Sequence, residues 1–308
     1  MVSIGIINSN GGAMELACAE AKGVGVIDVV EPSSLSVETA KANFPSLNVR
    51  HGYIGTELAK GMPCPDVYYV NVARRSYSAE ESAVPIVDKN VAGSNGNGVL
   101  VMKNAFRVIS LQEPEMFIVE TGLKIHTAAS EAFAAIPDYY IQQVVIKDVR
   151  ACGYPMKKQK SFLIGTKRGF SVKCSYTPVQ KLSAFLEKGV DYGELPAYAQ
   201  NRLNGLTRGF PSVVIDPRTD TLVPNINGHY AKDDSAVLVR DEATGNLRPL
   251  TVTEISRLYG FPDDYKWCGS KRQVIRQITD SPGVGLSAFL VNNVIRHYFE
   301  NCYKGSVL

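Results

Sequence analysis

The sequence predicts an α/β fold of the Rossmann-like type, in which a doubly wound sheet carries a small, irregular inserted domain. Through residues 1–150, short apolar runs alternate with helix-like segments, a pattern typical of parallel strands flanked by helices. Between residues 177 and 247 this periodicity weakens, and glycine, proline and asparagine are scattered among short β-like runs. A strongly apolar segment at 286–303 then predicts a helix that packs back on the first domain.

The predicted elements of the first domain follow in chain order. Strands are expected at residues 3–8, 24–30, 66–72 and 115–120, with helices at 13–22 and 34–43. Residues 73–98 form a polar, glycine- and asparagine-rich segment, which we interpret as a long functional loop. Two antiparallel strands at 140–147 and 161–167, joined by a basic turn, would complete the sheet as a hairpin.

The remaining elements are shorter. Residues 212–215 and 236–240 are β-like runs within the irregular region. Thr251 and Glu254 have the spacing of a capping box, which predicts a short helix that ends at Gly260.

Composition and charge describe an ordinary globular protein. The chain has 308 residues, of which 45% are hydrophobic and 20% charged, and its net charge of +3 neither demands nor excludes a polyanionic partner. No apolar run is long enough to cross a bilayer and the first residues form a strand, so we expect a cytoplasmic protein without a membrane partner. Six cysteines without paired spacing favour reduced thiols and give no support for a metal site.

A nucleotide-like ligand is the first functional hypothesis. The first strand leads through residues 8–12, which include Gly11 and Gly12, directly into a helix, and the second strand ends in Glu31. Such a turn exposes helix N-terminal amides, and an acid at the second position commonly accepts hydrogen bonds from ribose hydroxyls. Alternatively, the glycines form only a tight turn and Glu31 is a solvated loop acid. A nicotinamide oxidoreductase would use the same features, although the glycine pattern is incomplete.

Residues 248–265 closely resemble the segment R-x-L-T-x-R-E-x-x-R-L-Q-G-F-P-D of the DNA cytosine-5 methyltransferases. Residues 277–282 stand where that family has Q-I-G-N-A-V, and an oxidoreductase leaves the match at 251–265 unexplained. The resemblance covers nearly the whole chain. It implies a fold of the S-adenosylmethionine-dependent methyltransferases, with S-adenosylmethionine or a related donor as cofactor, DNA as partner and no metal. It also implies three parts: a catalytic-type domain at 1–175, a target-recognition-like domain at 176–247, and a C-terminal segment at 248–308 that returns to the first domain.

The same resemblance implies a donor site at the carboxyl ends of the first strands. Residues 7–12 resemble the family's F-x-G-x-G-G loop, residues 52–54 its G-D-I, and Glu31 its ribose-binding acid. Ser9, Tyr53 and Asp280 depart from the family's glycine, aspartate and asparagine. The cofactor-binding residues implied are Ile7, Asn8, Gly11, Gly12, Glu31, Pro32, Tyr53, Ile54 and Asp280.

The family's attacking cysteine has no counterpart at the usual place. Its segment D-x-x-x-x-G-x-P-C aligns without a gap on residues 66–74, which puts Arg74 at the cysteine position. Arginine cannot be deprotonated for nucleophilic work near neutral pH. Cys64 belongs to a Pro-Cys pair but precedes the strand, which would leave its thiol at the wrong end of the sheet. We interpret Cys64 as a turn cysteine and keep a role as nucleophile as the alternative.

Other catalytic positions are better preserved. Residues 117–121 resemble the family's E-N-V strand end, so Glu120 corresponds to the glutamate that binds the cytosine ring, with a helix-capping acid as the alternative. Residues 153–160 resemble G-x-P-Q-x-R-x-R, which places Lys158 and Lys160 at two arginine positions. If both lysines lie on a strand they share a face and could contact a flipped base and a phosphate, although a solvated basic hairpin is equally compatible with the pattern.

Two functional classes stay open. One is a transferase that moves a group from S-adenosylmethionine to DNA by an altered mechanism without the usual cysteine. The other is a catalytically inactive relative that binds DNA, a protein partner or both. Basic residues of the irregular region suit phosphate and base contacts in either case. They are Arg202, Arg208, Arg218, His229, Lys232 and Arg240.

Overall fold

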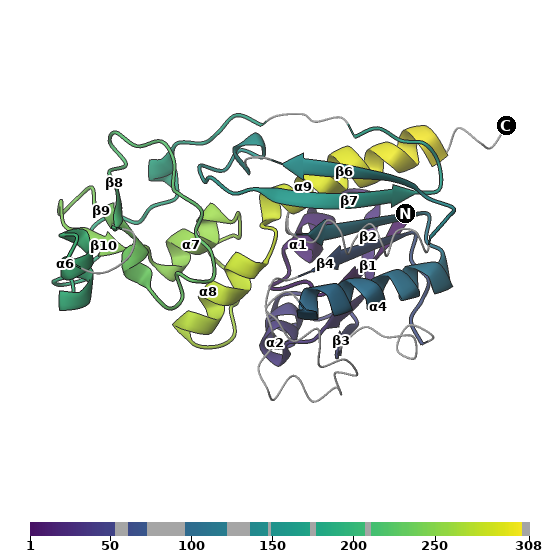
Figure 1. Ribbon diagram of the computed structural model, residues 1–308, viewed down its shortest axis with the longest axis horizontal. Helices are drawn as coiled ribbons and strands as arrows, with labels where there is room; N and C mark the ends of the chain where they lie inside the picture. The colour runs from purple at the N-terminus through teal and green to yellow at the C-terminus, as the bar shows by residue number, and fades with distance from the viewer. Residues whose placement is uncertain are drawn as a thin grey trace.

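A seven-stranded sheet and a three-stranded sheet lie at opposite ends of an elongated molecule (Figure 1). The computed structural model describes residues 1–52, 61–72, 96–121, 136–146, 149–172, 177–206 and 211–303. Helices cover both faces of the larger sheet, so the Rossmann-like α/β class expected from the sequence is confirmed.

Five parallel strands form the first part of the large sheet, in the order β3-β2-β1-β4-β5. This order reverses direction between β1 and β4, and ligands of open α/β sheets bind at such a point, beyond the carboxyl ends of the strands. Four of the five were predicted; the short β3 was not. The strands are β1 (Val2–Ile7), β2 (Val24–Glu31), β3 (Val49–His51), β4 (Val67–Asn71) and β5 (Met116–Thr121).

The predicted hairpin completes the sheet. Strands β6 (Tyr140–Ile146) and β7 (Lys160–Thr166) pair antiparallel, and β7 also pairs antiparallel with β5. The connection, expected as a basic turn, is more than a single turn. It contains a 3-10 turn at Val149–Ala151 and extends to residue 159, so Lys158 precedes β7 and does not lie on it.

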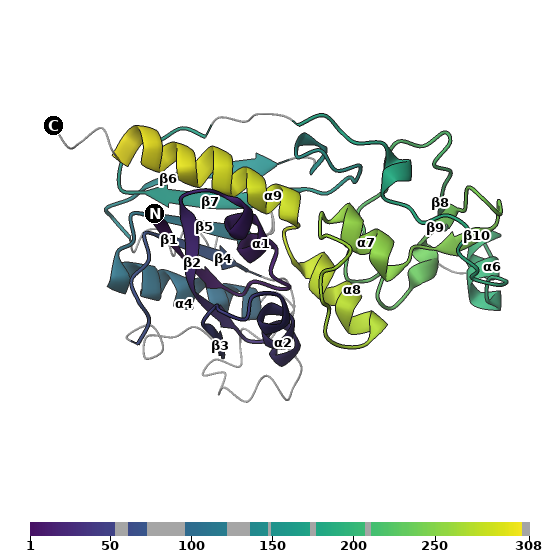
Figure 2. The ribbon, with the colours of Figure 1, turned by 180° about the vertical axis from the view of Figure 1, so that it is seen from behind.

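Two layers of helices cover the sheet. Helices α1 (Ala13–Glu20), α2 (Ser34–Asn43) and α9 (Val284–Phe289) contribute to the larger core on one face, and α4 (Gly96–Gln112) packs on the other. The last helix continues in π-helical turns at Leu290–Arg296 and Phe299–Tyr303 and lies along the sheet beside α1 (Figure 2). The apolar segment predicted at 286–303 is therefore helical, as expected.

The long polar segment ends earlier than predicted. Residues 96–98 belong to the first turn of α4 rather than to a loop. The helix extends because its later turns bury Ala105, Phe106 and Ile109 against the sheet, which offsets the poor helix propensity of its glycines. The rest of the predicted loop, residues 73–95, lies outside the described residues.

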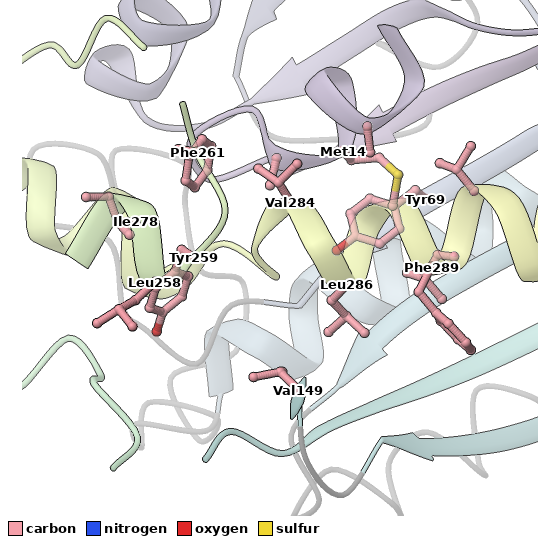
Figure 3. Packing of buried hydrophobic residues seen from close by; sticks show 14 of the residues in the cluster. Met14, Tyr69, Val149, Leu258, Tyr259, Phe261, Ile278, Val284, Leu286 and Phe289 are labelled. Carbon is pink, nitrogen blue, oxygen red and sulfur yellow. The ribbon is translucent and has the colours of Figure 1, made fainter. Parts of the chain in front are cut away.

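The small sheet has the order β10-β9-β8 and lies beside α6 at the far end of the molecule (Figure 1). Two short helices, α7 and α8, lie between it and the large sheet, and α8 was not predicted. Side chains from α7, α8 and α9 form one continuous core with Met14 and Tyr69 (Figure 3). The elements are α6 (Ala197–Leu203), β8 (Val213–Ile215), β9 (Val237–Arg240), β10 (Leu247–Pro249), α7 (Val252–Leu258) and α8 (Lys271–Asp280).

A buried arginine joins the small sheet to α7. Arg248 donates hydrogen bonds to both carboxylate oxygens of Glu254, at 2.7 and 2.8 Å, and to Asp241 at 3.2 Å. Glu254 also accepts the Thr251 amide, and the Thr251 hydroxyl accepts the Glu254 amide, so the predicted capping box is confirmed. All three charged side chains are almost completely buried. One carboxylate therefore caps a helix and neutralises an internal cation.

No helix within the described ranges is both long and apolar enough to cross a membrane.

Candidate functional site

Side-chain and main-chain polar groups from four chain segments meet at the carboxyl edge of the large sheet. The Asn8 side-chain amide, just after β1, donates to the carbonyl of Asn71 at the end of β4, at 2.6 Å. The Asn71 side chain in turn donates to the carbonyl of Asp280, at the end of α8, at 3.2 Å. The carbonyl of Glu120, in β5, accepts the amide of Val72 at 3.0 Å. Three of the positions expected to form one site, Asn8, Glu120 and Asp280, therefore lie together.

The loop after β1 has a backbone that only a few residue types tolerate. Gly11 and Gly12 have φ angles of 102° and 83°, and Asn8 also has a positive φ, of 63°. A Cβ atom at Gly12 would lie 2.2 Å from the Tyr265 hydroxyl oxygen, and one at Gly11 would lie 3.2 Å from the Trp267 ring. Close packing against these two aromatic rings therefore requires the glycines, whatever ligand the loop binds.

Glu31 is fully buried, so its interpretation as a solvated loop acid is wrong. Its carboxylate accepts the main-chain amides of Asn10 and Ser33, at 3.0 and 3.1 Å. Burial raises the pKa of Glu31 to about 7, against the opposing effect of these amides. Each carboxylate oxygen can accept a second hydrogen bond, so Glu31 orders the loop and keeps acceptor capacity for a ligand. The next residue, Pro32, is buried as well, and the Ile7 side chain packs in the core beneath α4.

Three buried side chains around this loop have acceptor oxygens without a hydrogen-bond partner: Asn8 Oδ1, both carboxylate oxygens of Glu15, and Gln277 Oε1. The orientation of the two amides is determined, because the Asn8 nitrogen bonds the Asn71 carbonyl and the Gln277 nitrogen bonds the Cys268 carbonyl at 2.8 Å. Unsatisfied buried acceptors are uncommon, and here they fit a ligand that brings hydrogen-bond donors or positive charge.

These buried acids predict an unusual dependence of stability on pH. Burial raises the pKa of both Glu15 and Glu31 from 4.5 to about 7, so the folded chain binds more protons than the unfolded chain between those values. Their stabilising contribution is complete below pH 4.5 and is lost as the pH rises through 7. A shift of this size corresponds to about 3 kcal/mol for each carboxyl group.

We expect the thermal midpoint of the ligand-free protein to fall between pH 5 and pH 7, and Glu15→Gln to make that fall shallower. The exposed Glu20, on the same helix, provides the control Glu20→Gln, which should leave the slope as in the wild type. Parallel slopes for all three proteins would contradict a buried, protonated Glu15.

A second cluster surrounds Glu120. The Tyr69 hydroxyl donates to one carboxylate oxygen at 2.6 Å, and the Lys160 ammonium donates to the other. Burial and the Glu120 carboxylate together raise the pKa of Tyr69 well above its usual value, so Tyr69 remains a donor. Residues 122–135 lie outside the described residues, so the alternative role of Glu120 as a helix cap stays open.

Lys158 is buried, so its interpretation as a solvated surface lysine is wrong. Its ammonium donates to the Tyr259 hydroxyl at 2.7 Å and to the carbonyls of Thr279 and Ser281 at 3.3 and 3.4 Å. Burial and the nearby charge of Lys160 lower the pKa of Lys158 well below its usual value. Lys158 therefore ties the loop before β7 to the C-terminal segment, whereas Lys160 alone contacts Glu120.

Cys64 lies at the opposite edge of the sheet from Glu120. Its thiol is exposed and donates to the carbonyl of Gln112 at 3.1 Å, before β4 begins. Because β4 and β5 are parallel and Asn71 pairs with Glu120, the length of β4 separates the two groups, roughly 15 Å at 3.3 Å per residue. The predicted location of Cys64 at the amino end of the strand is confirmed. Arg74, Tyr53 and Ile54 lie outside the described residues.

Comparisons with known proteins find similarity to DNA methylases. Residues 217–296 match the family of C-5 cytosine-specific DNA methylases. The chain is 24% identical over 279 residues to the type II methyltransferase M1.ScrFI of Lactococcus lactis subsp. cremoris, which covers 82% of this chain and 68% of that protein. The chain is therefore similar to the C-5 cytosine-specific DNA methylases over residues 217–296 and to a type II methyltransferase over most of its length.

Solved structures of methyltransferases share the fold. The Entamoeba histolytica methyltransferase EhMeth has a TM-score of 0.74 at 12% identity, with 96% of this chain and 98% of that chain covered. A mutant of Spodoptera frugiperda DNMT2 has a TM-score of 0.74 at 14% identity, with coverages of 96% and 100%. At these identities the likeness concerns the fold alone.

Several basic residues that we assigned to DNA contacts are paired with acids in the structure. Arg202 bonds Asp233, and Arg218 and Arg240 both contact Asp216. Arg218 is well exposed, and exposed ion pairs contribute little to stability, so a phosphate could replace its partner. Arg208 lies outside the described residues.

Sequence reasoning missed Glu15, Tyr69 and Tyr259. Only Glu15 had a local signal, an acid within the otherwise apolar first turns of a predicted helix. The roles of the tyrosines depend on which distant segments become neighbours, and no short motif reports that. Among the described residues, no group of three or more His, Cys, Asp or Glu side chains could hold a metal ion.

Proposed function

We propose that this methylase relative transfers a group from S-adenosylmethionine, or a related donor, to DNA without a cysteine nucleophile. The observation that carries the proposal is the meeting of two polar clusters at one sheet edge: the acceptor-rich loop around Asn8 and Glu31, and the ion pair of Glu120 with Lys160. A group transfer requires one subsite for the molecule that gives the group and a neighbouring subsite for the base that receives it.

The residues around the β1 loop fit the donor. S-adenosylmethionine supplies an electrophilic methyl group on a positively charged sulfur, together with ribose hydroxyls and an amino group that donate hydrogen bonds. Acceptor oxygens of Asn8, Glu15 and Gln277 lack partners, and Glu31 keeps acceptor capacity. The Asp280 carbonyl accepts the Asn71 side-chain amide, which joins the end of α8 to the end of β4. We propose that these residues bind and orient the donor, with Ile7, Gly11, Gly12 and Pro32 shaping the site.

The second cluster would position the acceptor base. The Glu120 carboxylate can accept a proton or a hydrogen bond from a base amine, and its ion pair with Lys160 holds it in position. Cytosine carbon 5 is a poor nucleophile until a thiol adds to the ring, and the Cys64 thiol lies at the other edge of the sheet. We therefore propose an acceptor that is already nucleophilic, such as an exocyclic amine or a previously modified base.

The small sheet and its surroundings would contact DNA. We propose that residues 176–247 form a target-recognition domain between the catalytic-type domain and the C-terminal segment. Support comes from the separate position of β8, β9 and β10 at the end of the molecule (Figure 1). Exposed arginines in this region, such as Arg218, would exchange an aspartate for a phosphate on binding.

The second candidate is a catalytically inactive protein that binds DNA or a protein partner. It is favoured by one observation: both oxygens of Glu120 already accept hydrogen bonds within the protein, from Tyr69 and Lys160. A substrate base would have to share or displace one of these bonds.

Calorimetry distinguishes the two candidates. We expect S-adenosylmethionine and S-adenosylhomocysteine to bind the purified protein with one site per chain, because the loop retains acceptors for both. Absence of heat with either ligand, together with a salt-sensitive shift of DNA in a mobility assay, would support the inactive DNA-binding candidate instead.

A further inference from the structure

Glu15 differs from the other buried acids of the described residues. It is 1% exposed, and neither of its carboxylate oxygens has a hydrogen-bond partner. The other five buried acids all have partners: Asp28 with Arg50, Glu31 with two main-chain amides, Glu120 with Lys160, and Asp241 and Glu254 with Arg248. A buried carboxyl group without a partner lowers the stability of the fold, so we expect Glu15 to have a functional role.

The surroundings of Glu15 contain acids and hydroxyl groups. Glu15 lies in the first turn of α1, directly after the glycine loop. The Ser9 hydroxyl and the Glu15 main chain oppose the effect of burial on the pKa of Glu15. The groups that interact with Glu15 through charge are the thiol of Cys18, the carboxyl of Glu31, and the phenols of Tyr69 and Tyr265. None of these carries a positive charge. Both phenols already donate elsewhere, Tyr69 to Glu120 and Tyr265 to the carbonyl of Gly11.

Two further orphan acceptors belong to the same neighbourhood. Asn8 Oδ1 lies in the loop itself. Gln277 lies on α8, and its main-chain oxygen would be 3.3 Å from a Cβ atom placed at Gly11. The side-chain oxygens of Asn8, Glu15 and Gln277 around the loop thus lack hydrogen-bond donors. The two acids, Glu15 and Glu31, also have no cation as partner among the described residues. A positively charged ligand that donates hydrogen bonds would supply both the missing donors and the missing positive charge.

We propose that the Glu15 carboxylate is the counter-charge for the sulfonium group of S-adenosylmethionine. The inference rests on the proposed function and adds to it a cause of donor selectivity. When the cation binds, the Glu15 carboxyl releases its proton to solvent and remains as a buried carboxylate that the sulfonium neutralises. S-adenosylhomocysteine has a neutral thioether at the same atom, so it offers Glu15 no counter-charge. Glu15 therefore makes the site prefer the donor over its by-product.

Calorimetry at pH 6.5 with both ligands tests this role. We expect the wild type to bind S-adenosylmethionine about 10- to 100-fold more tightly than S-adenosylhomocysteine, the range given by one charge-assisted interaction. Titrations in two buffers of different ionisation enthalpy should show that a proton is released with S-adenosylmethionine only. In Glu15→Gln, both the preference and the proton release should disappear, whereas the exposed control Glu20→Gln should behave as the wild type. Melting curves verify that each variant is folded.

The possible outcomes separate the inference from the proposed function. If Glu15→Gln weakens both ligands equally, or keeps the wild-type preference, Glu15 is not the counter-charge although donor binding stands. If the wild type binds neither ligand, the proposed function fails and this inference fails with it.

Discussion

Replacing Arg248 by alanine is expected to lower the free energy of unfolding by about 3–5 kcal/mol, the usual consequence of breaking a buried ion pair from one side. The variant leaves Glu254 and Asp241 buried without their cation, and it weakens the capping box that starts α7. Typical domains have a total stability of about 5–15 kcal/mol, so this loss is a large fraction of it. Chemical denaturation of both proteins measures the difference.

A neighbouring arginine provides the matched control. Arg257 forms an equally short pair with Asp263, at 2.7 Å, but the two side chains are 26% and 61% exposed. Arg257→Ala should therefore cost less than about 1 kcal/mol. Similar losses in the two variants would mean that burial of the Arg248 network contributes little. The comparison also explains the long sequence match at 248–265, because Arg248, Thr251 and Glu254 depend on one another physically.

The elements that the sequence predicted are those whose pattern is local. The predicted strands in the parallel part of the sheet contain consecutive apolar residues because both faces of a parallel sheet are covered. Strand β3 was missed because it has three residues and only Val49 is buried. Helix α8 was not predicted, although Ser270 and Gln273 form a capping box at its start.

The site was only partly predictable, for a topological reason. The resemblance placed Glu120 and both lysines near the edge of the sheet, but it could not supply their partners. Tyr69 reaches Glu120 because β4 pairs with β5, where Tyr69 lies opposite Ile118, two residues from Glu120 on the same face. Lys160 reaches it because β7 pairs with β5, where Phe162 lies opposite Glu120. Both contacts follow from strand order, which no single segment encodes.

The same geometry predicts the effect of changing the acid. If Glu120 accepts a proton or hydrogen bond from the acceptor base, Glu120→Gln should slow group transfer to DNA by about 100-fold or more, the usual contribution of a positioned acid or base. Donor affinity should change little, because the donor loop lies at β1 and Glu120 lies in β5. Single-turnover transfer from labelled S-adenosylmethionine, with calorimetry of the same variant, separates the two quantities.

Cys64→Ser is the control for this experiment, and it carries the opposite expectation. The Cys64 thiol donates a hydrogen bond to the Gln112 carbonyl beyond the amino end of β4. Partial burial and the nearby Asp66 carboxylate raise its pKa, so neither position nor ionisation suits a nucleophile. Transfer by Cys64→Ser should equal that of the wild type. A complete loss would mean that the thiol reaches the base after all, and that the chain uses the covalent chemistry of cysteine-dependent methylases. Retained transfer with a slow Glu120→Gln would instead leave the carboxylate, in contact with Tyr69 and Lys160, as the group that activates the acceptor.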